Sequence, residues 1–393
     1  MGQNAGCLGL ALVTLLAASR TPQAADQFTP VVVSPVTNKI GPVLGTDGKH
    51  HVVYEVACTN TRPVTATLQK IAVVDASDPS RVIAAYDDGP LLSRLRTLGN
   101  SAPGAPEIEF NGTRLVLIHL AFDSGAAVPR RLAHHIELLG ASPDPKELTP
   151  IATSYTVAPL DLAPLGLVIG PPLAGPGWVA LNGCCEAAGV HRGTALPING
   201  QLYFAQRFAI DWMRLDDRGR LVHGDPADVH SYTGYGADVL AVADGTVVAM
   251  RQNLDDQTPP NLPDPKTIDI ESVDGNHVVL ALGNGVFANY AHLQKDSLRV
   301  QVGDRVRRGQ VLGRLGNSGN SSAPHLHFHI MDGLSVLGSD GLPYVIDRFD
   351  LAGQIPGTRS DELDGDFGAF LFRQPLARGQ QYPLDLAVVH FTQ

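Results

Sequence analysis

The stretch His325-Leu326-His327-Phe328-His329 constrains the fold of this chain more than any other segment. Successive side chains of a β-strand face opposite sides of a sheet, so a strand here would carry three imidazoles on one face and two apolar side chains on the other. Three buried imidazoles are costly unless a metal ion, a carboxylate or water satisfies them. Zinc binds neutral imidazole well, and a catalytic zinc site has about three protein ligands and one open position. The segment therefore predicts a β-sheet with a polar site on one face.

The composition extends the β prediction to the rest of the chain. Charged residues make up 17% of the 393 residues, below the average of about 25%, which argues against long solvated helices and coiled coils. The 41 glycines and 29 prolines favour many short strands joined by turns. Segments 52–61, 65–77 and 113–124 alternate apolar and polar residues. We therefore assign the chain to the all-β class, with an immunoglobulin-like sandwich expected over residues 27–160.

Turn residues and a hairpin signal divide the second half of the chain. Residues 161–177 are rich in Pro and Gly and are interpreted as a linker. A second all-β region is expected over residues 178–350, where Gly-Asn-Gly at 283–285 separates two strand-like segments and indicates a hairpin. Residues 252–274 are polar and carry four prolines, which indicates an inserted surface loop. The tail, residues 351–393, is expected to pack back onto one of the domains.

The N-terminal segment and the net charge bear on location and partners. Residues 8–18 form an apolar run that is too short to span a bilayer, which takes about 20 residues, but suits the core of a secretory signal. Residues 1–25 are therefore interpreted as a signal peptide; the alternative is a buried N-terminal helix. No later segment is apolar enough to span a membrane, which predicts a secreted or periplasmic bacterial protein. The formal net charge of −10 argues against nucleic acid and anionic membranes as main partners.

The cysteines set one further limit. Without the signal, Cys58, Cys184 and Cys185 remain, so at most one disulfide can form within the chain. The adjacent pair is followed by His191, but this is not a standard zinc-binding spacing.

Asp211 is a second marker of a polar site. It lies inside the apolar run Phe208–Trp212, where an unpaired carboxylate is costly. A metal ion would satisfy it, and so would an ion pair with Arg207 or Arg214. His292, at the end of a strand-like segment just past the predicted hairpin, is a further polar residue of interest.

Six motifs follow one another in the second half of the chain. They are FAID (208–211), VLAVADGTVVA (239–249), GNHVVL (275–280), YAHL (290–293), VGDRVRRGQVLGRLGNSG (302–319) and PHLHF (324–328). In this order they resemble the lysostaphin and LytM family of zinc metallopeptidases, which cut peptide bonds in bacterial cell-wall peptidoglycan. The resemblance covers about residues 204–333. It implies a compact antiparallel β domain with a groove across one sheet, and Zn²⁺ as cofactor.

The resemblance also implies roles for individual residues. Asp211 and His327 match two metal ligands, and His292 and His325 match the two catalytic histidines beside the metal-bound water. The family's first ligand is a histidine four residues before the aspartate, and Arg207 occupies that position here. Arginine stays protonated and cannot bind a metal, so Arg207 could instead pair with Asp211 and displace the ion.

Three outcomes for the metal site stay open at this point. Another residue could supply the third ligand; the candidates are His329, His191, His230 and His223. The site could also hold zinc weakly with extra water. Finally, the domain could have lost catalysis and kept its groove.

These outcomes correspond to different functions. The leading hypothesis is an exported zinc-dependent endopeptidase that hydrolyses peptide bonds in peptidoglycan or in another exported protein. The alternative is a catalytically degenerate domain that binds peptidoglycan or regulates a hydrolase. A third hypothesis gives the N-terminal sandwich a binding role of its own. That domain could target, space or inhibit the second one.

Overall fold

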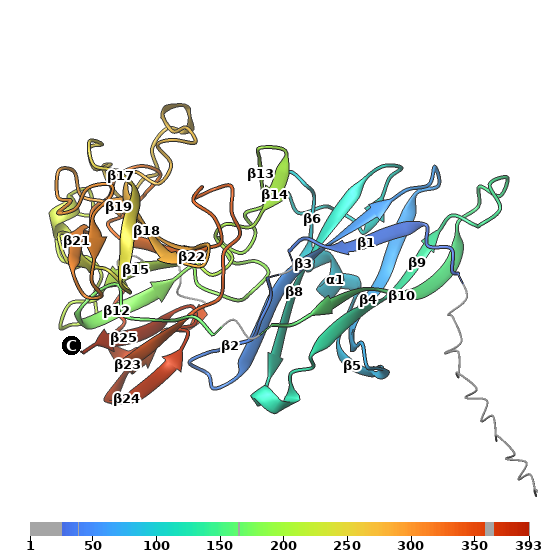
Figure 1. The fold of residues 1–393 in the computed structure, drawn as a ribbon, viewed down its shortest axis with the longest axis horizontal. Helices are drawn as coiled ribbons and strands as arrows, with labels where there is room; N and C mark the ends of the chain where they lie inside the picture. Colours follow the sequence, from blue (N-terminus) through green and yellow to red (C-terminus); the bar gives the residue numbers. More distant parts are fainter. Residues whose placement is uncertain (1–25, 38, 164–165, 358–364, 393) are drawn as a thin grey trace, which may run out of the picture.

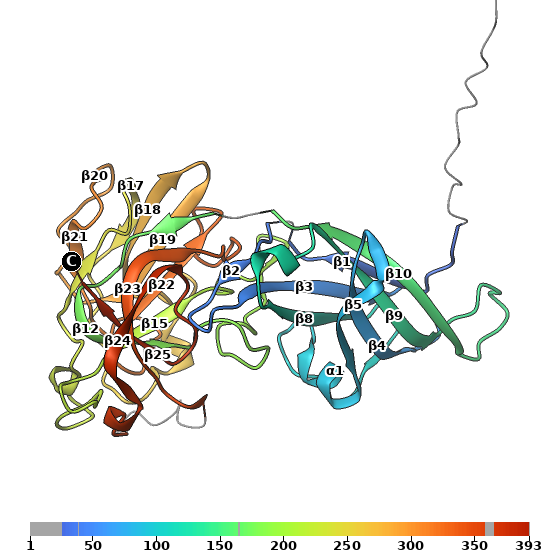
Figure 2. The ribbon, with the colours of Figure 1, turned by 90° about the horizontal axis from the view of Figure 1, so that it is seen from below.

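The computed structural model describes residues 26–37, 39–163, 166–357 and 365–392. The predicted signal peptide, residues 1–25, lies outside the described residues. Figures 1 and 2 show two β-rich bodies side by side, the first formed by the N-terminal strands and the second by the rest of the chain. The prediction of an all-β chain is confirmed. None of the described helices is long and apolar enough to cross a membrane.

The N-terminal body consists of two five-stranded antiparallel sheets. The first has the order β1-β3-β8-β6, with β2 paired to β3: β1 (Val31–Pro35), β2 (Val43–Leu44), β3 (His50–Asn60), β6 (Leu95–Arg96) and β8 (Thr113–Phe122). The second has the order β10-β9-β4-β5, with β7 paired to β4: β4 (Ala66–Asp75), β5 (Asp78–Asp87), β7 (Glu107–Ile108), β9 (Arg131–Gly140) and β10 (Ile151–Asp161).

One hydrophobic core joins these two sheets. Tyr54 and Val56 of β3 lie in the same buried cluster as Ile71 and Val73 of β4, so the sheets pack face to face. Helix α1 (Asp88–Arg94) adds Leu91 to this core. The body is therefore a β-sandwich, and its immunoglobulin-like character stays a prediction.

An 11-stranded sheet organises the second body. Its order is β11-β23-β25-β12-β15-β22-β19-β18-β17-β20, with β24 paired to β23. The strands are β11 (Val168–Ile169), β12 (Gly175–Leu181), β15 (Ile210–Arg214), β17 (Gly245–Arg251), β18 (Asn276–Gly283), β19 (Val286–Leu293), β20 (Arg305–Val306), β22 (Leu326–Met331), β23 (Val345–Gln354), β24 (Leu371–Gln381) and β25 (Ala387–Phe391). Two separate pairs are β13 (Leu196–Ile198) with β14 (Gln201–Tyr203), and β16 (Asp238–Leu240) with β21 (Val311–Arg314). Short 3₁₀ helices span Gly125–Ala127, Val229–Ser231, Pro265–Thr267 and Gly368–Phe370.

The order of strands in this sheet shows how distant segments meet. The predicted hairpin is confirmed as the antiparallel pair β18 and β19. At the other side, β25 pairs with both β12 and β23. The last strands of the chain thus belong to the same sheet as β15 and β22, which carry Asp211 and His327.

The cysteines agree with the limit of one disulfide. Cys184 and Cys185 are joined to each other by a disulfide, and Cys58 is free. Cys58 lies in the core of the sandwich, where burial raises the pKa of its thiol to about 12. It is therefore a buried apolar residue rather than a reactive thiol.

Candidate metal centre

The centre begins where β15 and β22 lie side by side. Their antiparallel register pairs Asp211 with His327, and Oδ1 of Asp211 lies 2.8 Å from Nδ1 of His327. The neighbouring Ile210, Leu326 and Phe328 are buried in the hydrophobic core on the other side of these strands. The alternation predicted from the sequence is confirmed, with apolar side chains on one face and polar ones on the other.

His191 supplies a third donor from a different part of the chain. It lies in the segment between β12 and β13, and its Nε2 is 3.2 Å from Oδ2 of Asp211. The ring packs edge-on against His327, with ring centroids 4.9 Å apart. One donor atom from each of His191, Asp211 and His327 lies within 4.8 Å of the others, and all three residues are buried. Among the candidate third ligands, His191 is the one that reaches Asp211.

The spacing of these donors fits a zinc ion. Zinc bonds of roughly 2.0–2.1 Å in a tetrahedron put neighbouring donor atoms about 3.4 Å apart. The separations of 3.2 Å between His191 and Asp211 and of 2.8 Å between Asp211 and His327 are close to this value. The donor atoms of the third pair, His191 and His327, lie within 4.8 Å of each other.

The hydrogen bonds that orient the two histidine rings also suit a bound metal ion. Nδ1 of His191 lies 3.2 Å from the Ala209 carbonyl oxygen, to which it can donate. Nε2 of His327 lies 3.1 Å from Nδ1 of His329 and can donate there. In these tautomers the nitrogens that face Asp211 carry no proton, as metal binding requires. Together with the donor spacing, these bonds make the group suitable for a divalent metal.

Arg207 does not contact Asp211, which corrects the expectation that it could displace the ion. Its Nη2 lies 2.6 Å from Oε2 of Glu55 on β3, and its Nη1 donates to the Gly341 carbonyl oxygen over 3.0 Å. Arg214 is not a partner of Asp211 either, because its Nε donates to the Pro176 carbonyl oxygen. The carboxylate is instead surrounded by histidines.

His292 and His325 stand beside these donors. Their ring centroids are 4.7 Å apart, and with His327 they form a second group whose nitrogens lie within 4.8 Å of one another. Nδ1 of His292 lies 2.8 Å from the Ser318 carbonyl oxygen, and Nδ1 of His325 lies 2.7 Å from the Ala323 carbonyl oxygen. These carbonyls hold a proton on Nδ1 of each ring, so Nε2 is the nitrogen that remains available for chemistry.

The backbone and the local charges set these two histidines apart. His292 has φ = 60°, a strained left-handed conformation for a residue that is not glycine. Burial lowers the pKa of His292 well below its usual range, and the charges of His325 and His327 add to this effect. Burial alone would also lower the pKa of His325, but the Asp211 carboxylate outweighs it and raises the pKa. His292 is thus the neutral ring of the pair and His325 the one that retains a proton more readily.

Asp211 and His191 shift each other's pKa values. Burial alone would raise the pKa of Asp211, but His191 and His325 outweigh it and hold the pKa well below its usual range. Conversely, Asp211 overcomes the effect of burial and raises the pKa of His191. The carboxylate is therefore ionised and attracts a cation to the centre.

The other three candidates for the third ligand, His329, His230 and His223, do not join the group around Asp211 in the described part of the chain. His329 is behind His327, and its Nε2 is buried without a hydrogen-bond partner among the described residues. It contacts His327 rather than Asp211, so the structure does not support it as the third ligand. His230 packs against the ring of Tyr235 at a centroid distance of 5.0 Å. Neither His230 nor His223 belongs to a group of metal-binding side chains in the part of the chain that the structure describes.

Two polar residues of the centre were not anticipated from the sequence. Nδ2 of Asn182 donates to Oδ2 of Asp211 over 2.7 Å. Oγ of Ser321 lies 3.2 Å from Nδ1 of His325. Neither stands in a recognisable motif, so no pattern in the sequence could have identified them.

Known proteins are similar to part of the chain that forms this centre. The family model of Peptidase family M23 matches residues 228–337, which include His292, His325 and His327. Among curated proteins, the chain is similar to the glycyl-glycine endopeptidase ALE-1 of Staphylococcus capitis, with 48% identity over 58 residues. It is also similar to the peptidoglycan DD-endopeptidase ShyA of Vibrio cholerae, with 42% identity over 57 residues.

These similarities are short. Each covers 14% of this chain, and they cover 16% of ALE-1 and 13% of ShyA, so the chain spans less than a fifth of the length of the curated relatives it matches. Among solved structures, the catalytic domain of lysostaphin from Staphylococcus simulans aligns with a TM-score of 0.23 and 22% identity, over 42% of this chain and 86% of that chain.

Proposed function

Since residues 228–337 belong to peptidase family M23, we propose that this chain is an exported zinc-dependent endopeptidase that hydrolyses peptide bonds in peptidoglycan. The names of the relatives, a glycyl-glycine endopeptidase and a peptidoglycan DD-endopeptidase, support this substrate class. The single observation that carries the proposal is the group of His191, Asp211 and His327, whose donor atoms lie within 4.8 Å of one another. It offers a complete set of three ligands despite the arginine at position 207.

The proposal assigns a role to each part of the chain. Residues 1–25 direct export, and residues 27–160 form the N-terminal domain. The linker that the sequence predicts over residues 161–177 is shorter in the structure, because β11 (Val168–Ile169) and β12, from Gly175 onward, already pair within the 11-stranded sheet. The peptidase domain is assigned to residues 178–350 together with these strands, and residues 351–393 complete it. The strand β25, which pairs with β12 next to β15, supports the last assignment.

The proposed ligands are Nε2 of His191, the Asp211 carboxylate and Nδ1 of His327. When bound there, zinc would polarise the scissile carbonyl group and lower the pKa of a water molecule toward about 7. The chain itself orients the ligands: Ala209 fixes the ring of His191, His329 fixes the ring of His327, and Asn182 fixes the carboxylate. A centre held in this way is preorganised for the metal.

His292 and His325 would transfer protons and stabilise the negative charge that develops during hydrolysis. Nε2 of the neutral His292 ring can accept a proton from the attacking water and later return one to the leaving amine. Nε2 of His325, which holds a proton more readily beside Asp211, can donate a hydrogen bond to the oxyanion of the tetrahedral intermediate. The Ser318 carbonyl keeps the proton of His292 on Nδ1 and leaves its Nε2 free to accept, while the Ala323 carbonyl accepts from Nδ1 of His325 and leaves Nε2 of the protonated ring free to donate.

Arg207 favours the second candidate function, a catalytically degenerate domain that binds peptidoglycan or regulates a hydrolase. It stands where the resemblance expects a ligand, and it is committed to Glu55 instead. Under this alternative the same groove would hold a peptide without cleaving it.

A digestion assay separates the two functions. Purified peptidoglycan is incubated with the protein, and new amino termini are counted before chelation, after chelation, and after zinc is added back. The proposal predicts release that stops on chelation, returns with zinc, and is strongly reduced in a His292→Ala variant that still binds zinc. A protein that binds peptidoglycan but releases no amino termini at saturating zinc would instead support the non-catalytic function.

A further inference from the structure

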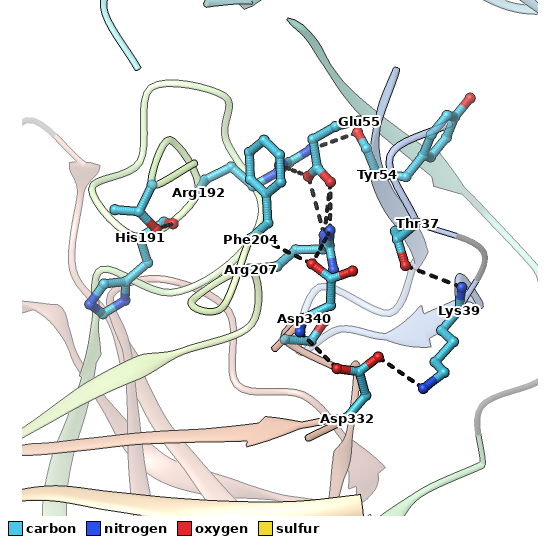
Figure 3. Close-up of polar contacts among 12 residues, drawn as sticks. Thr37, Lys39, Tyr54, Glu55, His191, Arg192, Phe204, Arg207, Asp332 and Asp340 are labelled. Atoms are coloured by element: carbon cyan, nitrogen blue, oxygen red, sulfur yellow. Dashed lines mark hydrogen bonds and ion pairs between the residues drawn. The ribbon is translucent and has the colours of Figure 1, made fainter. Parts of the chain in front are cut away.

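Two arginines of the second body converge on one carboxylate of the first. Glu55 is on the central strand β3 of the sandwich and is fully buried, and Arg192 and Arg207 are each 2% exposed. Figure 3 shows Arg192 to the left of Glu55 and Arg207 below it, with dashed lines that run to the Glu55 carboxylate. The contact therefore joins the two bodies through buried charge.

The two terminal nitrogens of Arg192 make three contacts with the sandwich. Its Nη1 pairs with Oε1 of Glu55. Its Nη2 donates to the carbonyl oxygens of Tyr54, over 2.8 Å, and Ile118, over 3.1 Å. Two strands of the sandwich, β3 and β8, thus fix the position of this side chain.

Arg207 contacts residues of both bodies. Its Nε lies 3.2 Å and 3.1 Å from the two oxygens of Glu55, and its Nη2 lies 3.5 Å from Oδ1 of Asp340. Oδ1 of Asp340 also accepts from the backbone N–H of Phe204, over 2.9 Å. The cluster formed by Glu55, Arg192, Arg207 and Asp340 balances two positive charges with two negative ones, as buried ions require.

Both arginines lie close to a proposed metal ligand along the chain: Arg192 follows His191, and Arg207 precedes Asp211 by four residues. Arg192 directly follows His191, so the Cα atoms of these two residues are about 3.8 Å apart. Arg207 precedes Ala209, whose carbonyl accepts from Nδ1 of His191, and Ala209 precedes Asp211 by two residues. Each arginine therefore connects Glu55 to a chain segment that carries a proposed ligand.

We propose that Glu55 of the sandwich is a positioning residue of the metal centre, which holds His191 in place through Arg192 and keeps Arg207 away from Asp211. The N-terminal sandwich is then part of the metal-binding machinery, in addition to any targeting role. This inference rests on the proposed function, because it takes His191 as a zinc ligand. It explains how a chain with arginine at the usual ligand position keeps a complete site.

The loss of Glu55 would act on the centre in two ways. Without its counterion, Arg192 no longer anchors the segment that carries His191. Arg207 loses its main acceptor as well, and Asp211, four residues further along the same segment, becomes a competing carboxylate. Both effects weaken zinc binding without changing any ligand.

The test compares zinc affinity in full-length variants by competition with a fluorescent chelator. Glu55→Gln keeps the size of the side chain and removes its charge. The matched control is Glu137→Gln, which removes a half-exposed carboxylate from the same sandwich, where it pairs with Lys70. We expect Glu55→Gln to weaken zinc affinity roughly 10–100-fold, as for other residues that support a metal ligand. The control should bind zinc like the wild type.

Circular dichroism of the metal-free proteins shows which variants are folded. A folded Glu55→Gln protein that binds zinc as tightly as the wild type would overturn the inference and leave the proposed function intact. Failure of the wild type to bind zinc would instead contradict the proposed function itself. If Glu55→Gln does not fold, zinc affinity is measured in Arg192→Lys instead. This variant keeps the positive charge but loses the hydrogen bonds to the Tyr54 and Ile118 carbonyls. It should weaken zinc affinity, and unchanged affinity would overturn the inference.

Discussion

Nε2 of His191 lies 3.2 Å from Oδ2 of Asp211, although the two residues belong to different segments and no recognised motif links them. Four residues before Asp211, where the resemblance expects a ligand, Arg207 is turned toward Glu55. Under the proposed function, His191 takes the place of the histidine that the segment before Asp211 lacks.

Replacing His191 should remove the metal. In His191→Ala the group loses one of three protein donors, and two donors hold zinc much more weakly. We expect about one zinc per chain in the wild type and a loss of most of it, with the digestion activity, in the variant. Metal analysis of protein purified without added zinc gives the answer. His230→Ala is the control, because His230 contacts Tyr235 and not Asp211; equal zinc content in His191→Ala and the control would contradict the ligand role.

His329 should support the centre without being a ligand. Its Nδ1 accepts from Nε2 of His327, so His329→Ala should reduce zinc affinity roughly 10–100-fold while zinc at saturation still reaches one per chain. His329→Asn can place an amide oxygen near the lost acceptor and should restore part of the affinity. Titration with a competing chelator measures both values. A fall in the saturating stoichiometry would instead identify His329 as a ligand.

His292 and His325 should affect turnover and not metal content. Their Nε2 atoms are assigned to proton transfer and oxyanion stabilisation, so alanine at either position should lower kcat about 10²–10⁴-fold. Zinc content should stay near that of the wild type in both variants. The two quantities are measured on the same protein samples. Retained turnover in either variant would show that the corresponding ring has no part in the reaction.

The buried charge cluster should make stability depend on pH through Glu55. Burial alone would raise the pKa of Glu55, but Arg192 and Arg207 outweigh it and lower the pKa below the ordinary value of 4.5. A carboxyl group with a lowered pKa in the folded state contributes stability above its unfolded pKa. That contribution is lost as the pH falls through the folded pKa.

The comparison of wild type and Glu55→Gln isolates this effect. Removing one partner of a buried ion pair costs about 3–5 kcal/mol, so the variant should melt at a lower temperature at pH 7. The difference in melting temperature should shrink below about pH 4.5, as Glu55 becomes protonated in the wild type. Melting curves of the metal-free proteins from pH 7 to pH 3 measure it. A difference that stays constant over this range would contradict the assigned charge state.

Local patterns in the sequence were enough to predict the core of the centre. The alternation in His325–His329 has the period of a strand, and the structure has β22 with imidazoles on one face and apolar residues on the other. Asp211 within an apolar run indicated a buried carboxylate with positively charged or metal partners. The hairpin of β18 and β19 followed from its Gly-Asn-Gly turn.

The third donor could be named only as one of several candidates. The position of His191 depends on Arg192, whose partners Glu55, Tyr54 and Ile118 belong to the other body. Such long-range contacts leave no periodic signal in the segment itself. For the same reason Arg207 was expected to compete for Asp211, since its partner Glu55 lies 152 residues away along the chain.

A crystal structure of the zinc-soaked protein, with anomalous data at the zinc edge, tests the central claim most directly. The account predicts one peak within about 2.1 Å of Nε2 of His191, an oxygen of Asp211 and Nδ1 of His327, with Arg207 still paired to Glu55. A peak without His191 among the ligands would contradict it. So would a site without zinc in which Arg207 contacts Asp211.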